Sequence, residues 1–138
     1  MSTVHITRTL SAPVERVWTA FTDPEALTAW FWPERLGPKV TADVRTGGRF
    51  RIDATSAGFA ATGVYQEVSP PRRLVMTWQW DGDGDDTAAG LVTVELTARG
   101  DCTDLDLRHE RLANDAERDT HAQGWNDCLD RLPDWLSC

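Results

Sequence analysis

The order in which hydrophobic periodicity changes along the chain restricts its fold more than any other feature. Residues 4–10 alternate, residues 14–31 follow helical spacing, residues 38–109 alternate again, and helical spacing returns from residue 114. A period of two places side chains on one face of a strand, and spacings of three and four place them on one face of a helix. The expected order is therefore one strand, short helices, a run of strands and one long helix.

Two short helices are expected after the first strand. Pro13 stands at the expected first helical position. Asp23 is expected to cap the second helix and Pro33 to end it, because proline disfavours helical geometry in the residue before it. The apolar face of the first helix comprises Val14, Val17, Trp18 and Phe21.

The second helix ends in three consecutive aromatic residues, Trp30, Phe31 and Trp32. Three neighbouring side chains of a helix point over a wide arc, so one buried face cannot take all of them. Trp30 and Phe31 share a face with Leu27, whereas Trp32 lies off that face and next to Pro33. We therefore expect Trp32 to line the mouth of a hollow.

The segment 38–109 predicts an antiparallel meander of about six strands. Apolar and polar residues alternate on both sides of Gly47 and Gly48, a pair that suits a turn with positive φ at one or both residues. Short connections favour pairing between strands that follow each other in the sequence. Each strand is then expected to have one solvated and one buried face.

One long amphipathic helix is expected at the C-terminal end. Asn114 and Glu117 have the spacing of a capping box, and Pro133 is expected to kink or restart the helix. Gly124 is expected to let the helix approach the sheet, since it has no Cβ. The apolar stripe comprises His121, Gly124, Trp125, Cys128, Leu129 and Leu132.

Four segments of the chain resemble the activator of heat-shock-protein-90 ATPase homologue family: SAPVERVWTAFTDPEALTAWFWP, ADVRTGGRFR, GVYQEVSPPRRLVMTWQW and HAQGWNDCLDRL. The family belongs to the START-like (SRPBCC, birch-pollen-allergen-like) superfamily. The resemblance implies an α+β helix-grip fold and a single domain over residues 1–138. In that fold a curved antiparallel sheet of about six to seven strands wraps a long C-terminal helix, and two short helices follow the first strand. A cavity between sheet and helix is also implied.

The inward faces of the expected elements supply a largely apolar wall, the usual lining of a small-molecule pocket. An inward aromatic side chain can also simply pack in the core instead of lining a pocket. For Trp18, Trp78 and Trp125 the sequence does not decide between these two roles. The candidate ligand-binding residues are Trp30, Phe31, Trp32, Phe50, Ile52, Tyr65, Met76, Trp78, Trp80, Leu107, His109, His121 and Trp125.

Composition excludes several partner classes. The formal net charge is -8, with 22 acidic and 14 Lys or Arg residues, which argues against nucleic acid and against an anionic membrane surface. The arginine pairs Arg49/Arg51 and Arg72/Arg73 are surrounded by acids. No apolar run approaches the roughly 20 residues that a membrane helix needs, and the N-terminus has no signal-peptide pattern, so a cytoplasmic location is expected.

No metal, cofactor or catalytic residue is expected from motifs. The segment DGDGDD, residues 81–86, fails as an EF-hand loop because Asp86 stands where Gly is required and Val92 where Glu is required, so it is interpreted as a solvated hairpin tip. Cys102, Cys128 and Cys138 lack CxxC spacing and are expected to be reduced. Four further acidic residues are expected on the solvent-exposed faces of strands and of the long helix: Asp104, Asp106, Asp127 and Asp130.

Three functional hypotheses follow. The favoured one is a module that binds a small hydrophobic or aromatic molecule in the cavity. The second is an enzyme of the polyketide cyclase or aromatase type, with His109, Tyr65 or Glu110 as acid or base. The third is a co-chaperone that stimulates a heat-shock chaperone ATPase in the stress response. It is least favoured, because the sequence shows no additional N-terminal domain of the kind that eukaryotic activators use for docking. A homodimer stays open.

Overall fold

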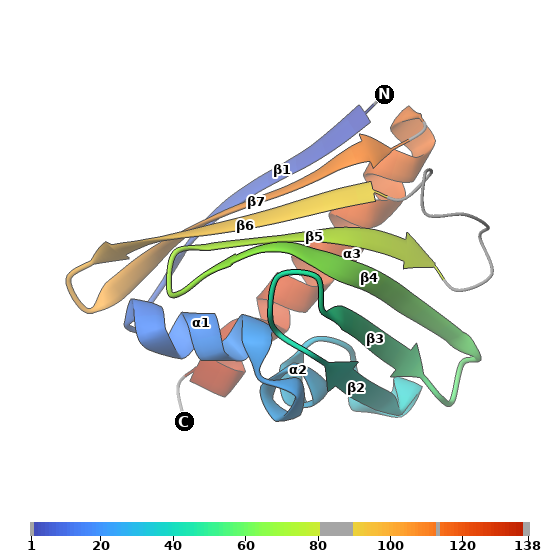
Figure 1. Ribbon diagram of the computed structural model, residues 1–138, viewed down its shortest axis with the longest axis horizontal. Coiled ribbons are helices and arrows are strands. Elements are labelled where there is room, and N and C mark those ends of the chain that lie inside the picture. The colour runs from blue at the N-terminus through green and yellow to red at the C-terminus, as the bar shows by residue number, and fades with distance from the viewer. Residues whose placement is uncertain (1, 81–89, 113, 137–138) are drawn as a thin grey trace.

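One antiparallel sheet runs through the computed structural model, which describes residues 2–80, 90–112 and 114–136 (Figure 1). Within these residues seven strands are ordered β1-β7-β6-β5-β4-β3-β2. The strands are β1 (Ser2–Leu10), β2 (Pro38–Ala42), β3 (Arg49–Ala54), β4 (Phe59–Ser69), β5 (Arg73–Trp80), β6 (Gly90–Arg99) and β7 (Cys102–Leu112). Strands β2 to β7 pair with their sequence neighbours, as predicted, and β1 joins the far edge beside β7.

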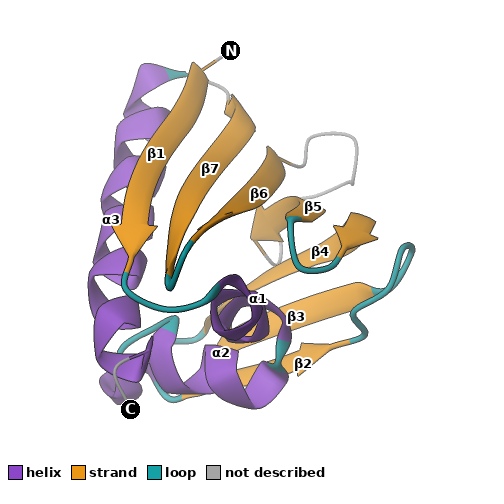
Figure 2. Cartoon of the chain, turned by 90° about the vertical axis from the view of Figure 1, so that its left-hand side faces the viewer, coloured by secondary structure: helices purple, strands orange, loops and turns teal. Residues whose placement is uncertain are grey.

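The helices lie on the concave side and at one end of the sheet. Figure 2 shows the sheet curving, with α3 along the β1 side and α1 and α2 closing the lower end. The expected curved sheet on a long C-terminal helix, with two short helices after the first strand, is therefore confirmed. The helices are α1 (Val14–Thr22), α2 (Pro24–Trp30), the 3-10 helix η1 (Glu34–Leu36) and α3 (Asp115–Leu136).

Alternation along the strands sets which side chains reach α3. On β7, Leu105, Leu107 and His109 are buried, and the residues between them are more exposed. Val92 and Val94 of β6 pair with His109 and Leu107 in register, so their side chains extend the same buried face. One core therefore continues across the strands and under the helix.

Side-chain caps start two of the helices at the residues expected. Asp23 accepts a hydrogen bond from the Glu25 amide at 3.1 Å, and Asn114 accepts one from the Glu117 amide at 2.9 Å. Pro13 is the N-cap of α1 rather than its first residue. The restart expected at Pro133 does not occur: α3 includes Pro133, which lacks one N–H donor, and continues to Leu136.

Two further sequence predictions concern a membrane helix and the segment 81–86. No helix among the described residues is long and apolar enough to cross a membrane. The segment DGDGDD, residues 81–86, lies outside the described residues.

The turn between β2 and β3 requires glycine for two separate reasons. Gly47 has φ of 87°, which confirms the expected positive angle. A Cβ on Gly48 would overlap the carbonyl oxygen of Asp43. The turn depends on one glycine for its backbone angle and on the other for close approach.

The prediction for Gly124 was wrong. A Cβ at this position would meet nothing within 4 Å, apart from the neighbouring residues and the helix's own backbone. The contact toward the sheet is made by the next residue, Trp125, whose side chain is buried, so Gly124 lies on an exposed part of α3. The missing side chain is therefore not needed for packing between helix and sheet.

We expect Gly124→Ala to raise the free energy of unfolding by about 1 kcal/mol, because alanine has the higher helix propensity and the position is open. Gly48→Ala should lower it, because the new methyl group meets backbone atoms. Chemical denaturation of both variants beside the wild type measures these changes. A destabilised Gly124→Ala variant would contradict the description of open space.

Candidate functional site

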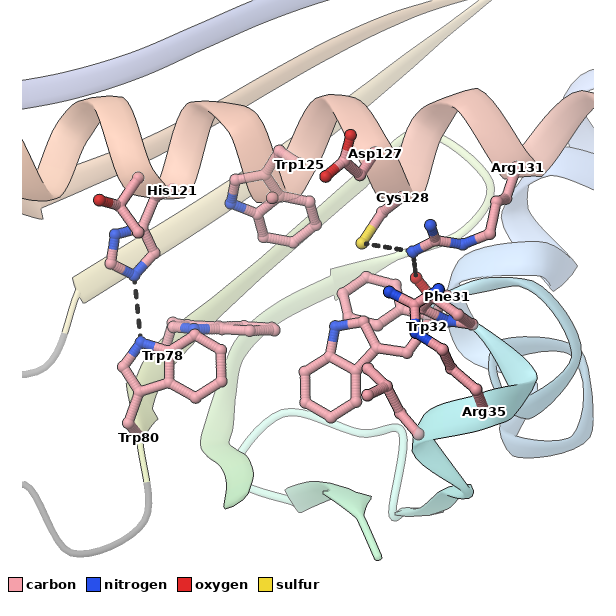
Figure 3. Close-up of a pocket in the computed structure, with 14 residues that line it drawn as sticks. Phe31, Trp32, Arg35, Trp78, Trp80, His121, Trp125, Asp127, Cys128 and Arg131 are labelled. Carbon is pink, nitrogen blue, oxygen red and sulfur yellow. Dashed lines mark hydrogen bonds between the residues drawn. The ribbon is translucent and has the colours of Figure 1, made fainter. Parts of the chain in front are cut away.

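An open pocket of about 550 Å³ lies between α3, the end of β5 and the segment that joins α2 to η1 (Figure 3). We call it the aromatic pocket. The segment from α2 to η1 contributes Phe31, Trp32, Pro33, Arg35 and Leu36. Strand β5 contributes Trp78 and Trp80, and α3 contributes Thr120, His121, Gly124, Trp125, Asp127, Cys128 and Arg131.

Aromatic rings from three elements form the wall of the aromatic pocket. Trp32 and Trp80 are nearly parallel, with ring centroids 6.2 Å apart and an interplanar angle of 9°. Phe31 contacts Trp125 edge-on at 5.5 Å, and Trp78 lies 5.3 Å from Trp125. These contacts connect the end of α2, strand β5 and helix α3.

The three consecutive aromatic residues separate as their helix ends. Trp30 is buried and donates its indole N–H to the Ala20 carbonyl at 2.8 Å, so it joins α2 to α1. Phe31 is the C-cap of α2 and packs in the ring cluster. Trp32 lies beyond the helix and lines the aromatic pocket. The backbone leaves the helix at this point, so the side chain of Trp30 packs against α1 whereas that of Trp32 lines the aromatic pocket.

Two hydrogen bonds between indole and imidazole join α3 to the sheet. Trp80 of β5 donates to Nε2 of His121 on α3 at 3.1 Å. Trp125 of α3 donates to Nδ1 of His109 on β7 at 3.0 Å. Because an indole N–H can only donate, each accepting imidazole nitrogen carries no proton. Nδ1 of His121 then donates to the Glu117 carbonyl at 2.8 Å, and His121 is neutral in this arrangement.

The imidazole of His109 is held in its neutral form by its surroundings. Only 1% of the residue is exposed. Burial, and then the neighbouring His121, lower the pKa of His109 to about 3. The ring centroids of the two histidines are 4.8 Å apart. His109 is therefore a buried hydrogen-bond acceptor at neutral pH.

The space between the sheet and the helices is largely filled by side chains. An internal cavity of about 20 Å³ remains there, which is room for about one water molecule. Phe50, Ile52, Tyr65 and Met76 are among the residues around it. Burial, and then Asp43, raise the pKa of Tyr65 to about 12, so this phenol stays protonated. The larger open space is the aromatic pocket, on the other side of Phe31, Trp78 and Trp125 from this cavity.

The structure divides the residues predicted for the site into two groups. Those lining the aromatic pocket are Phe31, Trp32, Trp78, Trp80, His121 and Trp125. Those placed elsewhere in the core are Trp30, Phe50, Ile52, Tyr65, Met76, Leu107 and His109. The second group faces inward as expected, but neighbouring side chains fill the space in front of it.

Sequence reasoning missed the polar residues of the aromatic pocket. Arg131 donates to the carbonyl oxygens of Trp30 and Phe31, at 3.2 and 2.6 Å. A helix end leaves such carbonyls unpaired, but no spacing in the sequence indicates which arginine reaches them. Arg35 was missed because it follows the aromatic run as an ordinary exposed residue. The other pocket residues missed were Pro33, Leu36, Thr120, Gly124, Asp127 and Cys128.

Neither nucleophilic nor metal chemistry is indicated in the described part of the chain. Burial raises the pKa of Cys128 to about 12, although nearby Arg131 acts in the opposite direction. No three His, Cys, Asp or Glu side chains gather among residues 2–80, 90–112 and 114–136 in a way that could hold a metal ion. Aromatic surface and cationic groups are what the aromatic pocket offers a ligand.

Comparisons with known proteins agree with this architecture. The family model described as "Activator of Hsp90 ATPase homolog 1-like protein" matches residues 11–137. The comparison with curated proteins gives no match.

Three solved structures illustrate the similarity. DynU16, a protein in the dynemicin biosynthetic locus, is 27% identical with a TM-score of 0.84; the match covers 99% of this chain but only 48% of DynU16. CalU16 from Micromonospora echinospora is 30% identical with a TM-score of 0.79, over 98% of this chain and 76% of CalU16. PFC0360w, an HSP90 activator from Plasmodium falciparum, is 24% identical with a TM-score of 0.80, over 99% and 97% of the two chains, and shows the fold alone.

The buried neutral His109 predicts a loss of stability in acid. As pH falls from about 6.5 toward 3, the unfolded chain takes up a proton at this imidazole that the folded protein does not. The free energy of unfolding should therefore fall by up to about 1.4 kcal/mol per pH unit from this group. Urea denaturation between pH 7 and pH 4 measures the slope.

His109→Asn is the matched control, since its Oδ1 can accept the Trp125 hydrogen bond without titrating. Its stability should fall less steeply with decreasing pH than that of the wild type. Equal slopes for the two proteins would show that His109 does not contribute.

Proposed function

Because the chain belongs to the Activator of Hsp90 ATPase homolog 1-like family, whose members differ in what they do, we propose its function from its own pocket: it binds a small aromatic or apolar molecule. The observation that carries this proposal is the open space of about 550 Å³ walled by Trp32, Trp78, Trp80 and Trp125. Ligand pockets commonly have volumes of about 300 to 1,000 Å³ and mostly apolar walls with a few polar groups. The aromatic pocket has that size and that composition.

The orientation of the rings favours a flat ligand. Trp32 and Trp80 present nearly parallel faces, and both contact Phe59, whose side chain is 42% exposed. Aromatic rings fixed in position by neighbouring rings offer contact surface at little cost in side-chain entropy. The similarity to DynU16, a protein in a biosynthetic locus, is consistent with a small-molecule ligand, although this chain spans about half of DynU16.

The other two hypotheses receive less support. The acid and base candidates of the cyclase hypothesis, His109, Tyr65 and Glu110, do not line the aromatic pocket. The co-chaperone hypothesis rests on family membership and on the fold shared with PFC0360w. A cytoplasmic location and a homodimer stay predictions.

Binding of N-phenyl-1-naphthylamine, a neutral aromatic fluorophore, tests the proposal. The wild type should bind it, and Trp32→Ala should weaken binding by about tenfold because one stacking face is lost. Fluorescence titration measures the dissociation constant, and chemical denaturation of the same samples measures folding.

Two variants make the result specific. Trp18→Ala removes a partly buried tryptophan of α1 that does not line the aromatic pocket, so affinity should be unchanged. Trp30→Ala removes a core ring and its hydrogen bond, and should cost about 3 to 5 kcal/mol of stability. A wild type that binds no probe, or equal affinities for Trp32→Ala and Trp18→Ala, would overturn the proposal.

A further inference from the structure

Two guanidinium groups line the aromatic pocket. Arg131 extends from α3 and Arg35 from η1, and Figure 3 shows both beside Phe31 and Trp32. Neither lies within 4.0 Å of a carboxylate among the described residues. Like charges that share a site raise its free energy unless an anion compensates them. The pair therefore leaves an uncompensated positive charge beside an aromatic surface.

Arg131 is fixed in position by neutral acceptors. Its Nε donates to the Trp30 carbonyl and its Nη2 to the Phe31 carbonyl, two acceptors at the C-terminal end of α2. These bonds orient the guanidinium group, but a carbonyl group carries no net charge. The cation is thus held in place without being neutralised.

Arg35 is free to contact a ligand. Its residue is exposed, and its side chain has no hydrogen-bond or ion-pair partner within the described ranges. Figure 3 shows its side chain extending from η1 toward α3. A guanidinium group offers several N–H donors in one plane, a geometry that suits a carboxylate.

One buried donor in the ring cluster has no acceptor. The indole Nε1 of Trp78 is buried and has no hydrogen-bond partner among the described residues. A buried donor left unpaired costs free energy, and an oxygen atom of a ligand would remove that cost. Trp78 lines the aromatic pocket with its ring, but its N–H is buried, so the charge of the two arginines carries the inference.

One acidic residue, Asp127, also lines the aromatic pocket. It is exposed, and no ion pair within the described ranges joins it to Arg35 or Arg131. The whole chain carries a formal net charge of -8. Two arginines without carboxylate partners are therefore a local exception to the charge of the protein.

We propose that the ligand of the aromatic pocket is an aromatic anion, a flat ring system that carries a carboxylate or sulfonate group. The rings stack against Trp32 and Trp80, and the anionic group meets Arg35 beside the fixed guanidinium of Arg131. This inference rests on the proposed function and specifies its ligand class.

A pair of probes that differ by one charge tests the inference. 8-Anilinonaphthalene-1-sulfonate has the ring system of N-phenyl-1-naphthylamine with a sulfonate added. The wild type should bind the sulfonate more tightly. Arg35→Gln should weaken binding of the sulfonate by up to about fivefold, the upper end of the range for one exposed charge interaction, and leave the neutral probe unchanged.

The control variants separate a local contact from a change in overall charge. Arg72→Gln makes the same charge change at the opposite end of β5 from Trp80 and should alter neither affinity. Arg35→Lys keeps the charge and should retain part of the preference for the sulfonate. Denaturation midpoints of all variants show whether each is folded.

The outcomes distinguish the two proposals. If the wild type binds neither probe, the proposed function and the inference both fail. If it binds both probes equally well, or if Arg35→Gln weakens both to the same extent, the inference fails and the proposed function stands. A selective loss of sulfonate binding in Arg35→Gln supports the inference.

Discussion

The contact of Trp125 with Phe31 and Trp78 is the interaction on which the rest of the structure depends. It brings together the middle of α3, the end of α2 and strand β5, which are far apart in the sequence. Large aromatic side chains bury the most apolar surface per residue, so a cluster of three determines how α3 lies on the sheet. The indole of Trp125 also donates to His109, which fixes the orientation of its ring as well as its position.

This packing decides where a ligand has room. The rings fill most of the space between the sheet and the helices and leave an internal cavity of about 20 Å³. The aromatic pocket has about 550 Å³. Trp78 and Trp125 contribute to both spaces, so part of the pocket wall is also core. Trp32, after the end of α2, contributes to the aromatic pocket without joining two elements by a hydrogen bond as Trp30 does. Trp32 is nevertheless buried, so binding and folding are coupled most strongly at Trp125, which also donates a hydrogen bond to His109.

Polar groups in this region are arranged around the same rings. The hydrogen bond from Trp80 to His121 needs a neutral imidazole, and so does the bond from Trp125 to His109. At the other end, Arg131 closes the C-terminal end of α2 and stands beside Arg35. The aromatic pocket thus has a hydrogen-bonded side at His121 and a cationic side at the arginines, which gives a bound molecule a defined direction.

The sequence by itself determined the element types, because periodicity, capping residues and turn glycines act over a few neighbours. The alternation in β7, the caps at Asp23 and Asn114 and the positive φ at Gly47 are effects of this local kind. Only the tertiary structure decided which inward residues meet open space: Leu107 and Trp32 are both apolar and buried, but only Trp32 lines the aromatic pocket. It also decided that Gly124 is exposed and that Arg35 and Arg131 share one end of the pocket. Those outcomes depend on how distant elements pack, which no local pattern of residues specifies.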